Sequence, residues 1–564
     1  MIPKNYVDQC WKQVNQVWTQ LKLNKPKVYS KEEKQGLGDV IACFNSLNKQ
    51  VYVDEENLEK KLGIKYLRSV LAHEAGHHKK CPWGLKNFVR LIAHAYKVTK
   101  NMTQAKLIEN LFGDILINTD IHNKGETSIK EVYQHLSGDT DSKSWQFYIS
   151  AFEHIINQPG SILKKQPKET MRKDAKKLSD ILSKDIYKSK RWPDTIKEFA
   201  KYVKKYMEED KKELSEKDSP ENQKGNSLPG NEGTTSVPPP YPPKQQTKKK
   251  TIKSIYKKAP LIDKHDTKDY LPFDKDKTPK EIQDKKVYDS VKGIAKEVGL
   301  NDFKKVMAGL GLGNSAQAKA CFYRDMVSDL SVELPRTNKG NRSYKPRRKA
   351  KWKISDPIES LDVEYSLSMF ARLIPNVTTY KNLSKDEGND DYGDSRPDLL
   401  IAMDSSGSMP NPDSHLSFPV MAAVLAAKTA LECGKQVAVV NFSTTYESLD
   451  FTNRDYKIDE ILTMYIGGGT TIPGNKINEL TSKHKYPTHL LIISDADIGN
   501  LSNELQNLES ALRNAGAGGT IILDCEPSKK TEQIVQIGYD VQFGRSFDEI
   551  AKLTLNKTKS LYAA

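Results

Sequence analysis

The sequence predicts a multidomain chain, with an α+β amino-terminal domain, a disordered lysine- and proline-rich linker followed by a small helical module, and a doubly wound α/β carboxy-terminal domain. Three observations predict this organisation. Two short apolar stretches precede a helix that carries two histidines, apolar strands alternate with helices near the carboxyl end, and the stretch between has almost no apolar content. The 564 residues are enough for two domains with sizeable cores.

The amino-terminal domain begins with a predicted pair of strands, Val40–Phe44 and Gln50–Val53, and continues into an apolar helix. This helix carries His73, Glu74 and His77 in a His-Glu-x-x-His pattern. Residues four apart lie about 40° apart around a helix, so the two imidazoles can hold one metal ion. Zn²⁺ lowers the pKa of a bound water to about 7, and Glu74 could take its proton. This order of elements resembles that of zincin peptidases.

A catalytic zinc takes three protein ligands and keeps one open position. A later apolar helix offers Asn110, Asp114 and Asn118, which recur every four residues and form one polar face. We predict Asp114 as the third zinc ligand, with Asn110 and Asn118 holding it or the histidines in place. Three other residues could supply the third ligand instead: Glu109, His122 and His78.

The carboxy-terminal domain carries a second constellation, Asp404, Ser406 and Ser408, directly after a predicted buried strand. Thr470 follows three glycines, and Asp495 ends another apolar strand. Carboxylate and hydroxyl oxygens are hard ligands, which suit Mg²⁺ or a similar divalent ion rather than zinc. Doubly wound sheets bind ligands at the carboxyl ends of their strands, and we expect these side chains to meet there.

This domain resembles a von Willebrand factor A domain, and five residues match its metal-ion-dependent adhesion site: Asp404, Ser406, Ser408, Thr470 and Asp495. In that family the ion keeps a coordination position for an acidic residue of a partner protein. The resemblance therefore implies a protein contact bridged by Mg²⁺. Thr471 could replace Thr470, and Asp497 could assist Asp495.

The whole chain resembles a prokaryotic family that joins a metallopeptidase-like domain to a von Willebrand A-like domain, often encoded beside MoxR-type AAA+ ATPases. The likeness covers about the first 160 and last 170 residues and includes the Asn-x-x-x-Asp-x-x-x-Asn helix. It implies a zinc metallopeptidase that binds an AAA+ ATPase or a protein substrate. The alternatives are a non-enzymatic adaptor stabilised by its metal and, third, a nucleic-acid-associated scaffold.

The net charge of +15 raises the nucleic-acid alternative, but its distribution weakens that idea. Residues 161–260 contain 26 basic and 14 acidic side chains, whereas residues 395–564 contain 15 basic and 20 acidic ones. The basic charge therefore belongs to the connecting region, which predicts a solvated spacer. A basic cluster between Arg336 and Lys353 could contact phosphates, but nothing in it would read base identity.

These patterns divide the chain into six parts. The first three are a zincin-like domain (1–165), a helical extension (166–210) and a disordered linker (211–262). A helical module (263–335), a connecting segment (336–394) and a von Willebrand A-like domain (395–564) follow. In the module, Thr278–Glu281 reads as a capping box with Pro279 at the first helical position. We expect it to open a helix that runs through Lys296, followed by a second helix at Ser315–Leu330.

The six cysteines lie far apart without a Cys-x-x-Cys pair, which predicts reduced thiols. Cys81 follows the histidine helix closely, but the proline after it predicts a loop residue and not a ligand. No apolar run approaches the roughly 20 residues of a membrane span, and the amino terminus has no hydrophobic signal core. We expect a cytoplasmic protein.

Overall fold

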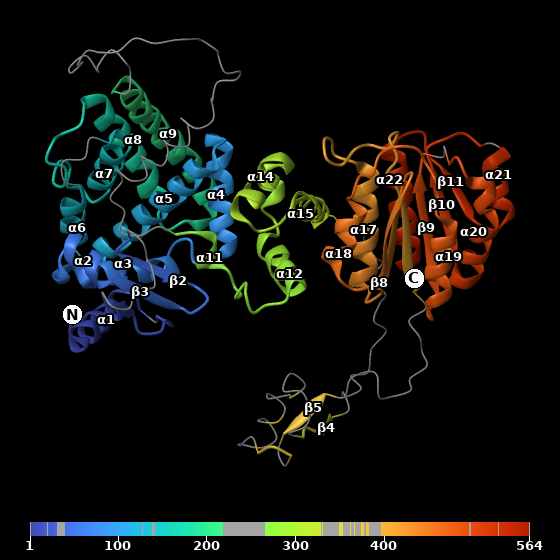
Figure 1. Cartoon of the computed structure of the whole chain (residues 1–564), viewed down its shortest axis with the longest axis horizontal. Coiled ribbons are helices and arrows are strands. Elements are labelled where there is room, and N and C mark those ends of the chain that lie inside the picture. Colours follow the sequence, from blue (N-terminus) through green and yellow to red (C-terminus); the bar gives the residue numbers. More distant parts are fainter. Residues whose placement is uncertain are drawn as a thin grey trace, which may run out of the picture. The chain divides into compact units, whose positions relative to one another are not determined.

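The computed structural model divides the chain into two compact units, Met1–Asp329 and Leu330–Ala564. Each unit contains helices and a β-sheet (Figure 1). The predicted helical extension and helical module both pack into the first unit. The structure describes residues 2–19, 21–30, 40–126, 128–137, 142–217, 265–328, 330, 349–353, 361, 366, 374–376, 379–382, 396–495, 498–527 and 529–562.

The sheet of the first unit has three strands in the order β1-β3-β2. β1 (Lys27–Tyr29) runs parallel to β3 (Gln50–Asp54), and β2 (Ala42–Asn45) runs antiparallel to β3. Buried and half-buried residues alternate along β2 and β3, which is the pattern of a sheet with one face on the core. Both strands predicted before the histidine helix are present, with ends that differ by one or two residues.

Five helices follow or flank this sheet, together with a short 3₁₀ turn (η1, Ile64–Tyr66): α1 (Lys4–Val17), α2 (Glu55–Lys61), α3 (Leu67–Lys79), α4 (Leu85–Thr99) and α5 (Met102–Asn123). α1 packs on α3, and the Trp18 indole after it donates from Nε1 to the Ala72 carbonyl at 2.7 Å. α3 and α5 are buried along most of their length, and the buried residues include polar side chains of both helices. They form the centre of the unit.

The remaining helices of the amino-terminal half are α6 (Ser128–Ser137), α7 (Lys143–Ile155), α8 (Glu169–Asp185) and α9 (Trp192–Lys217), with a 3₁₀ turn (η2, Ser189–Arg191) before α9. α9 lies against α4, α5 and α7. Its Asp210 carboxylate accepts the backbone N–H of Lys143 at 2.5 Å and so caps the first turn of α7. α9 runs past residue 211, where the linker was predicted to begin, and residues 218–264 of that region lie outside the described residues.

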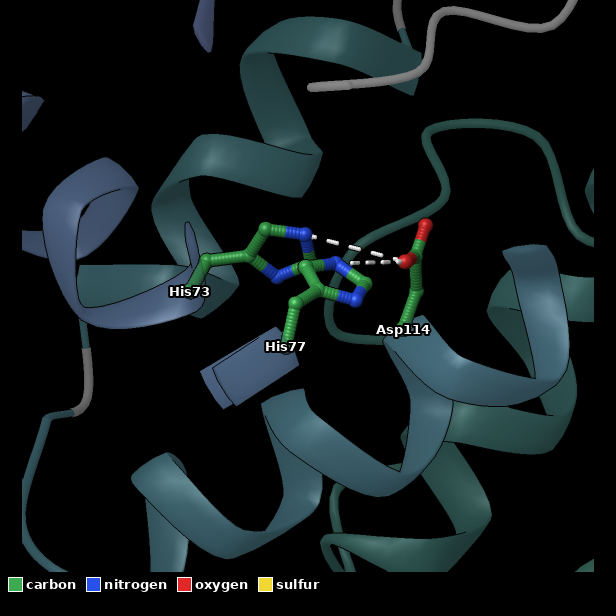
Figure 2. A group of neighbouring side chains, drawn as sticks. All are labelled: His73, His77 and Asp114. Atoms are coloured by element: carbon green, nitrogen blue, oxygen red, sulfur yellow. Dashed lines mark ion pairs between the residues drawn. The ribbon is translucent and has the colours of Figure 1, made fainter. Parts of the chain in front are cut away.

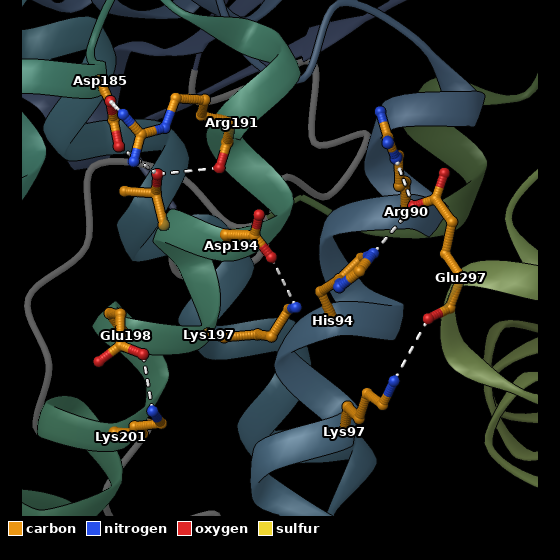
Figure 3. Close-up of polar contacts among 11 residues, drawn as sticks. Arg90, His94, Lys97, Asp185, Arg191, Asp194, Lys197, Glu198, Lys201 and Glu297 are labelled. Carbon is orange, nitrogen blue, oxygen red and sulfur yellow. Dashed lines mark hydrogen bonds and ion pairs between the residues drawn. The ribbon is translucent and has the colours of Figure 1, made fainter.

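The helical module consists of α11 (Thr267–Tyr270), α12 (Lys280–Val291), α13 (Ala295–Val298), α14 (Leu300–Leu310) and α15 (Ser315–Ser328). Glu297 fixes it to α4, because its Oε2 lies 2.7 Å from Arg90 Nε and 2.9 Å from His94 Nε2. The Glu297 carbonyl also accepts a hydrogen bond from Lys97 at 3.3 Å (Figure 3). The module is therefore an integral part of the first unit.

The predicted helix through Lys296 is wrong in its bounds. α12 ends at Val291, and Gly293, at φ +87°, turns the chain before α13. The predicted capping box is wrong as well. Pro279 is itself the N-cap, and Thr278 belongs to the preceding turn, where its N–H donates to the Asp274 carbonyl at 3.0 Å.

The sheet of the second unit has six strands in the order β11-β10-β9-β6-β7-β8. All neighbours run parallel except β7 and β8. The strands are β6 (Asp398–Asp404), β7 (Val437–Phe442), β8 (Tyr446–Thr452), β9 (Thr488–Ser494), β10 (Gly516–Leu523) and β11 (Asp540–Phe543). β6, β7 and β9 are buried throughout, which explains their continuous apolar runs. The predicted doubly wound α/β arrangement is thus observed as a mixed, mainly parallel sheet.

Helices cover both faces of this sheet (Figure 1). On one face lie α17 (Phe418–Glu432), α18 (Asp455–Leu462) and α22 (Phe547–Tyr562), and on the other lie α19 (Gly474–Lys483), α20 (Leu501–Ala515) and α21 (Lys529–Gln536). The predicted connecting segment at 336–394, with its basic cluster, lies largely outside the described residues; β4 (Lys349–Lys351) and β5 (Tyr380–Asn382) pair within it.

No disulfide links the six cysteines, all of which lie in the described ranges. Across those same ranges, none of the helices combines the length and apolar character that crossing a bilayer requires.

Candidate metal centres

α3 and α5 approach each other closely at Gly76, inside the His-Glu-x-x-His pattern. A Cβ atom placed there would lie 2.3 Å from Ile117 Cγ2 on α5 and 3.2 Å from Trp18 Cζ2. Such contacts are far shorter than van der Waals distance, so only glycine fits between the two helices. The close approach brings the histidines of α3 within reach of the polar face of α5.

His73, His77 and Asp114 form a buried group that could hold a metal ion. The Nε2 atoms of both histidines lie 3.6 Å from Asp114 Oδ1. Figure 2 shows the two imidazoles from α3 and the carboxylate from α5 turned toward one another. Two nitrogens and one oxygen at such spacing can converge on a single ion, and this donor set suits zinc.

Hydrogen bonds fix which ring nitrogen of each histidine can bind a metal. His73 Nδ1 lies 2.7 Å from Asn118 Oδ1, and His77 Nδ1 lies 3.1 Å from the Cys81 carbonyl oxygen. Both partners are acceptors, so each Nδ1 carries the proton and each Nε2 carries the lone pair. Metal-binding histidines are commonly oriented in this way. These buried residues therefore fit the zinc ion that the sequence predicts.

A second layer of hydrogen bonds orients these partners. The Asn118 amide donates from Nδ2 to the Tyr133 hydroxyl, which in turn lies 3.1 Å from the Tyr148 hydroxyl. Burial raises the pKa of Tyr148 well above its usual value and keeps this phenol neutral. Asn110 donates from Nδ2 to Asp114 Oδ2 at 3.3 Å. Both predicted asparagines thus contact the predicted ligands.

Glu74 is fully buried beside this group, and sequence reasoning missed its neighbour. His265 Nε2 lies 3.9 Å from Glu74 Oε2, and its ring centroid lies 4.0 Å from that of His77. The backbone N–H of His265 donates to Asn110 Oδ1 at 3.3 Å. His265 is a single histidine far along the chain, in no motif, so no pattern in the sequence points to it.

The other candidates for the third ligand lie elsewhere among the described residues. Glu109 is buried on α5 but is not part of the metal-binding group. His78 packs against Phe44, with ring centroids 5.5 Å apart, and His122 lies in the last turn of α5. Cys81 contributes its carbonyl and not its thiol, whose pKa burial raises well above the usual value.

In the second unit, Asp404 and Asp495 lie at the carboxyl ends of the adjacent parallel strands β6 and β9. The chain leaves β6 toward β7 on one side and returns to β9 on the other, so the strand order reverses between them. Such switch points open a crevice that binds ligands. The two predicted carboxylates therefore lie at the position in the sheet that favours a site.

The loop after β6 folds back on Asp404. The Ser406 N–H donates to Asp404 Oδ1 at 2.8 Å, and the Ser406 and Ser408 hydroxyls lie 3.2 Å apart. Ser494 donates from Oγ to Asp404 Oδ2 at 2.5 Å. These bonds orient the carboxylate and gather the hydroxyls of the Asp-x-Ser-x-Ser stretch around it.

The glycine loop before Thr470 packs against the loop after β6. The Gly407 N–H donates to the Gly468 carbonyl at 2.8 Å, and a Cβ on Gly407 would lie 3.2 Å from that oxygen. Gly468 itself, at φ +92°, adopts a backbone conformation that favours glycine. The Ser443 hydroxyl donates to the Gly469 carbonyl at 2.8 Å. Thr470 is half-buried next to this contact, whereas Thr471 is exposed; Asp497 lies outside the described residues.

The electrostatics of this edge favour a cation. Burial, with a further contribution from Asp495, raises the pKa of Asp404. Burial and then Asp495 also raise the pKa of Asp524, which follows β10. Asp495 Oδ1 is buried and receives no hydrogen bond from the residues that the structure describes. A divalent cation would neutralise the carboxylates and supply that oxygen with a partner. Sequence reasoning missed Asp524, Ser443 and Ser494, because isolated serines and aspartates carry no spacing signal.

No family model matches the sequence, and no curated protein matches it. Among solved structures, the pilus adhesin SpaC from Lactobacillus rhamnosus GG is similar at 12% identity, over 30% of this chain and 31% of that chain, with a TM-score of 0.25. An aerotolerance-related membrane protein from Bacteroides fragilis NCTC 9343, with multiple mutations to serines, is similar at 14% identity over 29% of this chain and 98% of that chain, with a TM-score of 0.22. This chain thus spans less than a third of the adhesin, and scores this low define no activity.

Proposed function

We propose that the amino-terminal unit is a zinc-dependent, zincin-like metallopeptidase domain and that the carboxy-terminal unit is a von Willebrand A-like domain that captures a protein partner. One observation supports the proposed function of the amino-terminal unit. Two Nε2 lone pairs, fixed by acceptors on each Nδ1, face one carboxylate oxygen, with Glu74 buried beside them. A buried histidine pair oriented in this way is typical of a metal site.

In this proposal, different residues bind the metal, transfer the proton and orient the histidines. His73, His77 and Asp114 would hold Zn²⁺, and the ion, when bound, would polarise a peptide carbonyl and acidify water. Glu74 would accept the proton of the attacking water on its carboxylate and return it to the leaving amine. Asn118 and the Cys81 carbonyl would keep the histidines in the tautomer that binds metal. The burial of Glu74 would exclude bulk water from this proton transfer.

The carboxy-terminal unit would bind Mg²⁺ or a similar ion through five residues: Asp404, Ser406, Ser408, Thr470 and Asp495. The buried Asp495 oxygen and the raised pKa of Asp404 support a cation at this edge. The ion would bridge to an acidic residue of a partner protein. A MoxR-type AAA+ ATPase or a protein substrate is the partner that the family resemblance suggests.

Glu74→Gln tests the proposed peptidase activity. The variant should retain zinc and lose hydrolysis of casein or of the chain itself, because the amide cannot accept a proton. Zinc content by atomic absorption and fragment analysis measure the two effects separately. Cleavage that persists in Glu74→Gln would refute the assigned role.

Asp404→Ala tests the adhesion site, since it should abolish Mg²⁺-dependent capture of the ATPase. Asp413→Asn, in the loop that follows, should leave capture intact. Equal capture by both variants would refute the proposal for this site.

The complete burial of His73 and Glu74 favours a second candidate function. A zinc ion enclosed in this way would stabilise the amino-terminal fold without turning over, and the protein would act as an adaptor through its second unit. Stoichiometric zinc with no hydrolysis, even with the ATPase present, would favour the adaptor over the peptidase.

A further inference from the structure

A chain segment distant from the His-Glu-x-x-His pattern reaches the amino-terminal metal group. Residues 265–270, at the start of the helical module, bring His265 to this group, and the side chain of His265 is only 1% exposed. Its ring lies against His77 and its Nε2 is at ion-pair distance from the Glu74 carboxylate. A buried imidazole is costly to desolvate, and an apolar side chain would fill the same space more cheaply. The polar ring therefore indicates a role at the site beyond packing.

The backbone of this segment is connected to the metal group as well. The backbone N–H of His265 donates to Asn110 Oδ1 at 3.3 Å. The side-chain amide of Asn110 in turn donates from Nδ2 to Asp114 Oδ2 at 3.3 Å. One asparagine thus links the position of residue 265 to the carboxylate that faces both histidines. The side chain of His265 meets Glu74, and its main chain meets the support of Asp114.

Contacts on several sides hold the segment in place. The Asp269 carbonyl accepts the Ser46 N–H, directly after the edge strand β2, at 2.8 Å. Asp266 pairs with Lys106 of α5 at 3.0 Å, and the Tyr270 ring lies 4.6 Å from that of Phe88 on α4. A loosely held cover would not need anchors on a strand and two helices. The segment is a fixed component of the site.

We propose that His265 is a positioning residue of the amino-terminal metal centre, which holds the Glu74 carboxylate in place, so that the centre is complete only when the segment beginning at His265 is docked. This inference rests on the proposed zinc site. It makes the site a product of two parts of the chain that lie on either side of residues 218–264. The amino-terminal helices alone would then bind metal without a correctly held Glu74.

Two substitutions in the full chain separate positioning from packing. His265→Phe keeps an aromatic ring and its tilted contact with His77 but removes both nitrogens. His265→Gln restores a polar group of similar reach. His78→Gln, next to His77 but packed on Phe44, is the matched control. All three should bind zinc stoichiometrically, because the ligand group is intact. His265→Phe should lower kcat by about 10- to 100-fold with little change in KM, as is typical for residues that orient a site, and His265→Gln should recover part of it.

The absorption spectrum of the cobalt-loaded protein gives a readout that does not depend on turnover. His265→Phe should shift the cobalt bands of the wild type, and the same substitution in a Glu74→Gln background should shift them much less, because the effect passes through Glu74. An unchanged spectrum in His265→Phe, or an equal shift in both backgrounds, would overturn the inference. Increased cleavage by His265→Phe would also overturn it and identify the segment as an inhibitory cover. If the wild type binds cobalt yet cleaves nothing, the peptidase proposal fails while the spectral cycle still decides the role of His265.

Discussion

Replacing Gly76 with alanine should separate the two helices that carry the metal group. The added Cβ would overlap Ile117 Cγ2 at 2.3 Å, and Ile117 is fully buried, so neither partner has room to move. Overpacking of this kind costs about 1–3 kcal/mol. Alanine also gains up to about 1 kcal/mol over glycine inside a helix. The net loss of stability should therefore be up to about 2 kcal/mol.

Gly113→Ala on α5 is the matched control. A Cβ there would lie 3.8 Å from both the Cys81 carbonyl and His77 Cε1, which is ordinary van der Waals contact. This variant keeps the helical gain without the overlap and should be stabilised by about 0.5–1 kcal/mol. Gly76→Ala should thus be less stable than Gly113→Ala by about 0.5–3 kcal/mol.

Urea denaturation of the chelator-treated proteins, followed by circular dichroism, measures the packing effect without metal. Zinc affinity by competition with a chelator measures the geometric effect. Gly76→Ala should weaken zinc binding, because moving α3 away from α5 lengthens the 3.6 Å distances from His73 and His77 to Asp114. Equal stability and equal zinc affinity in the two variants would refute the argument that glycine sets this helix spacing.

Three further changes test other parts of the structure. Asn118→Leu should reduce zinc affinity about 10- to 100-fold by releasing His73 Nδ1, and an unchanged chelator competition would contradict this. Burial lowers the pKa of His489 from 6.5 to about 4. The second unit should therefore keep its stability above pH 6.5 and lose up to about 3 kcal/mol of it as the pH falls toward 4. His489→Gln should flatten this profile when denaturation is measured as a function of pH. Glu297→Ala removes the acceptor for Arg90 and His94 and should increase hydrogen exchange in α12–α15 without affecting α20, and equal exchange there would count against this docking contact.

Much of the metal group could be predicted from the sequence, because helical periodicity alone fixes which side chains share a face. His73 and His77 are four residues apart on one helix, as are Asn110, Asp114 and Asn118 on another, so the group needs only these two helices in contact. The contact itself depends on Gly76, and a glycine inside a helix gives no sign of which neighbour approaches it. His265 was missed because tertiary packing, and not spacing, brings it to the site.

In the second site, too, some residues could be predicted from the sequence, whereas others are placed only by tertiary packing. The strand pattern placed Asp404 and Asp495 at one edge, since carboxyl ends of parallel strands meet there. Ser443 directly follows β7 and Ser494 is the last residue of β9, and only the sheet order, which the sequence does not state, brings these strand ends next to β6. Helix ends were predicted less well, because turns such as the one at Gly293 depend on a single backbone angle.

Cys81, whose carbonyl contacts His77, also carries a thiol whose rate of alkylation can be measured. Only the thiolate reacts with alkylating agents, and the Cys81 thiol is fully buried with its pKa raised well above normal. The half-buried Cys43, Cys433 and Cys525 should therefore be labelled well before it. Cys81 is buried just after α3, and its carbonyl oxygen would lie 3.8 Å from a Cβ on Gly113 of α5, so we expect its labelling rate to report on local opening at this end of the metal group. Mass spectrometry of that one peptide would follow this motion without any added probe.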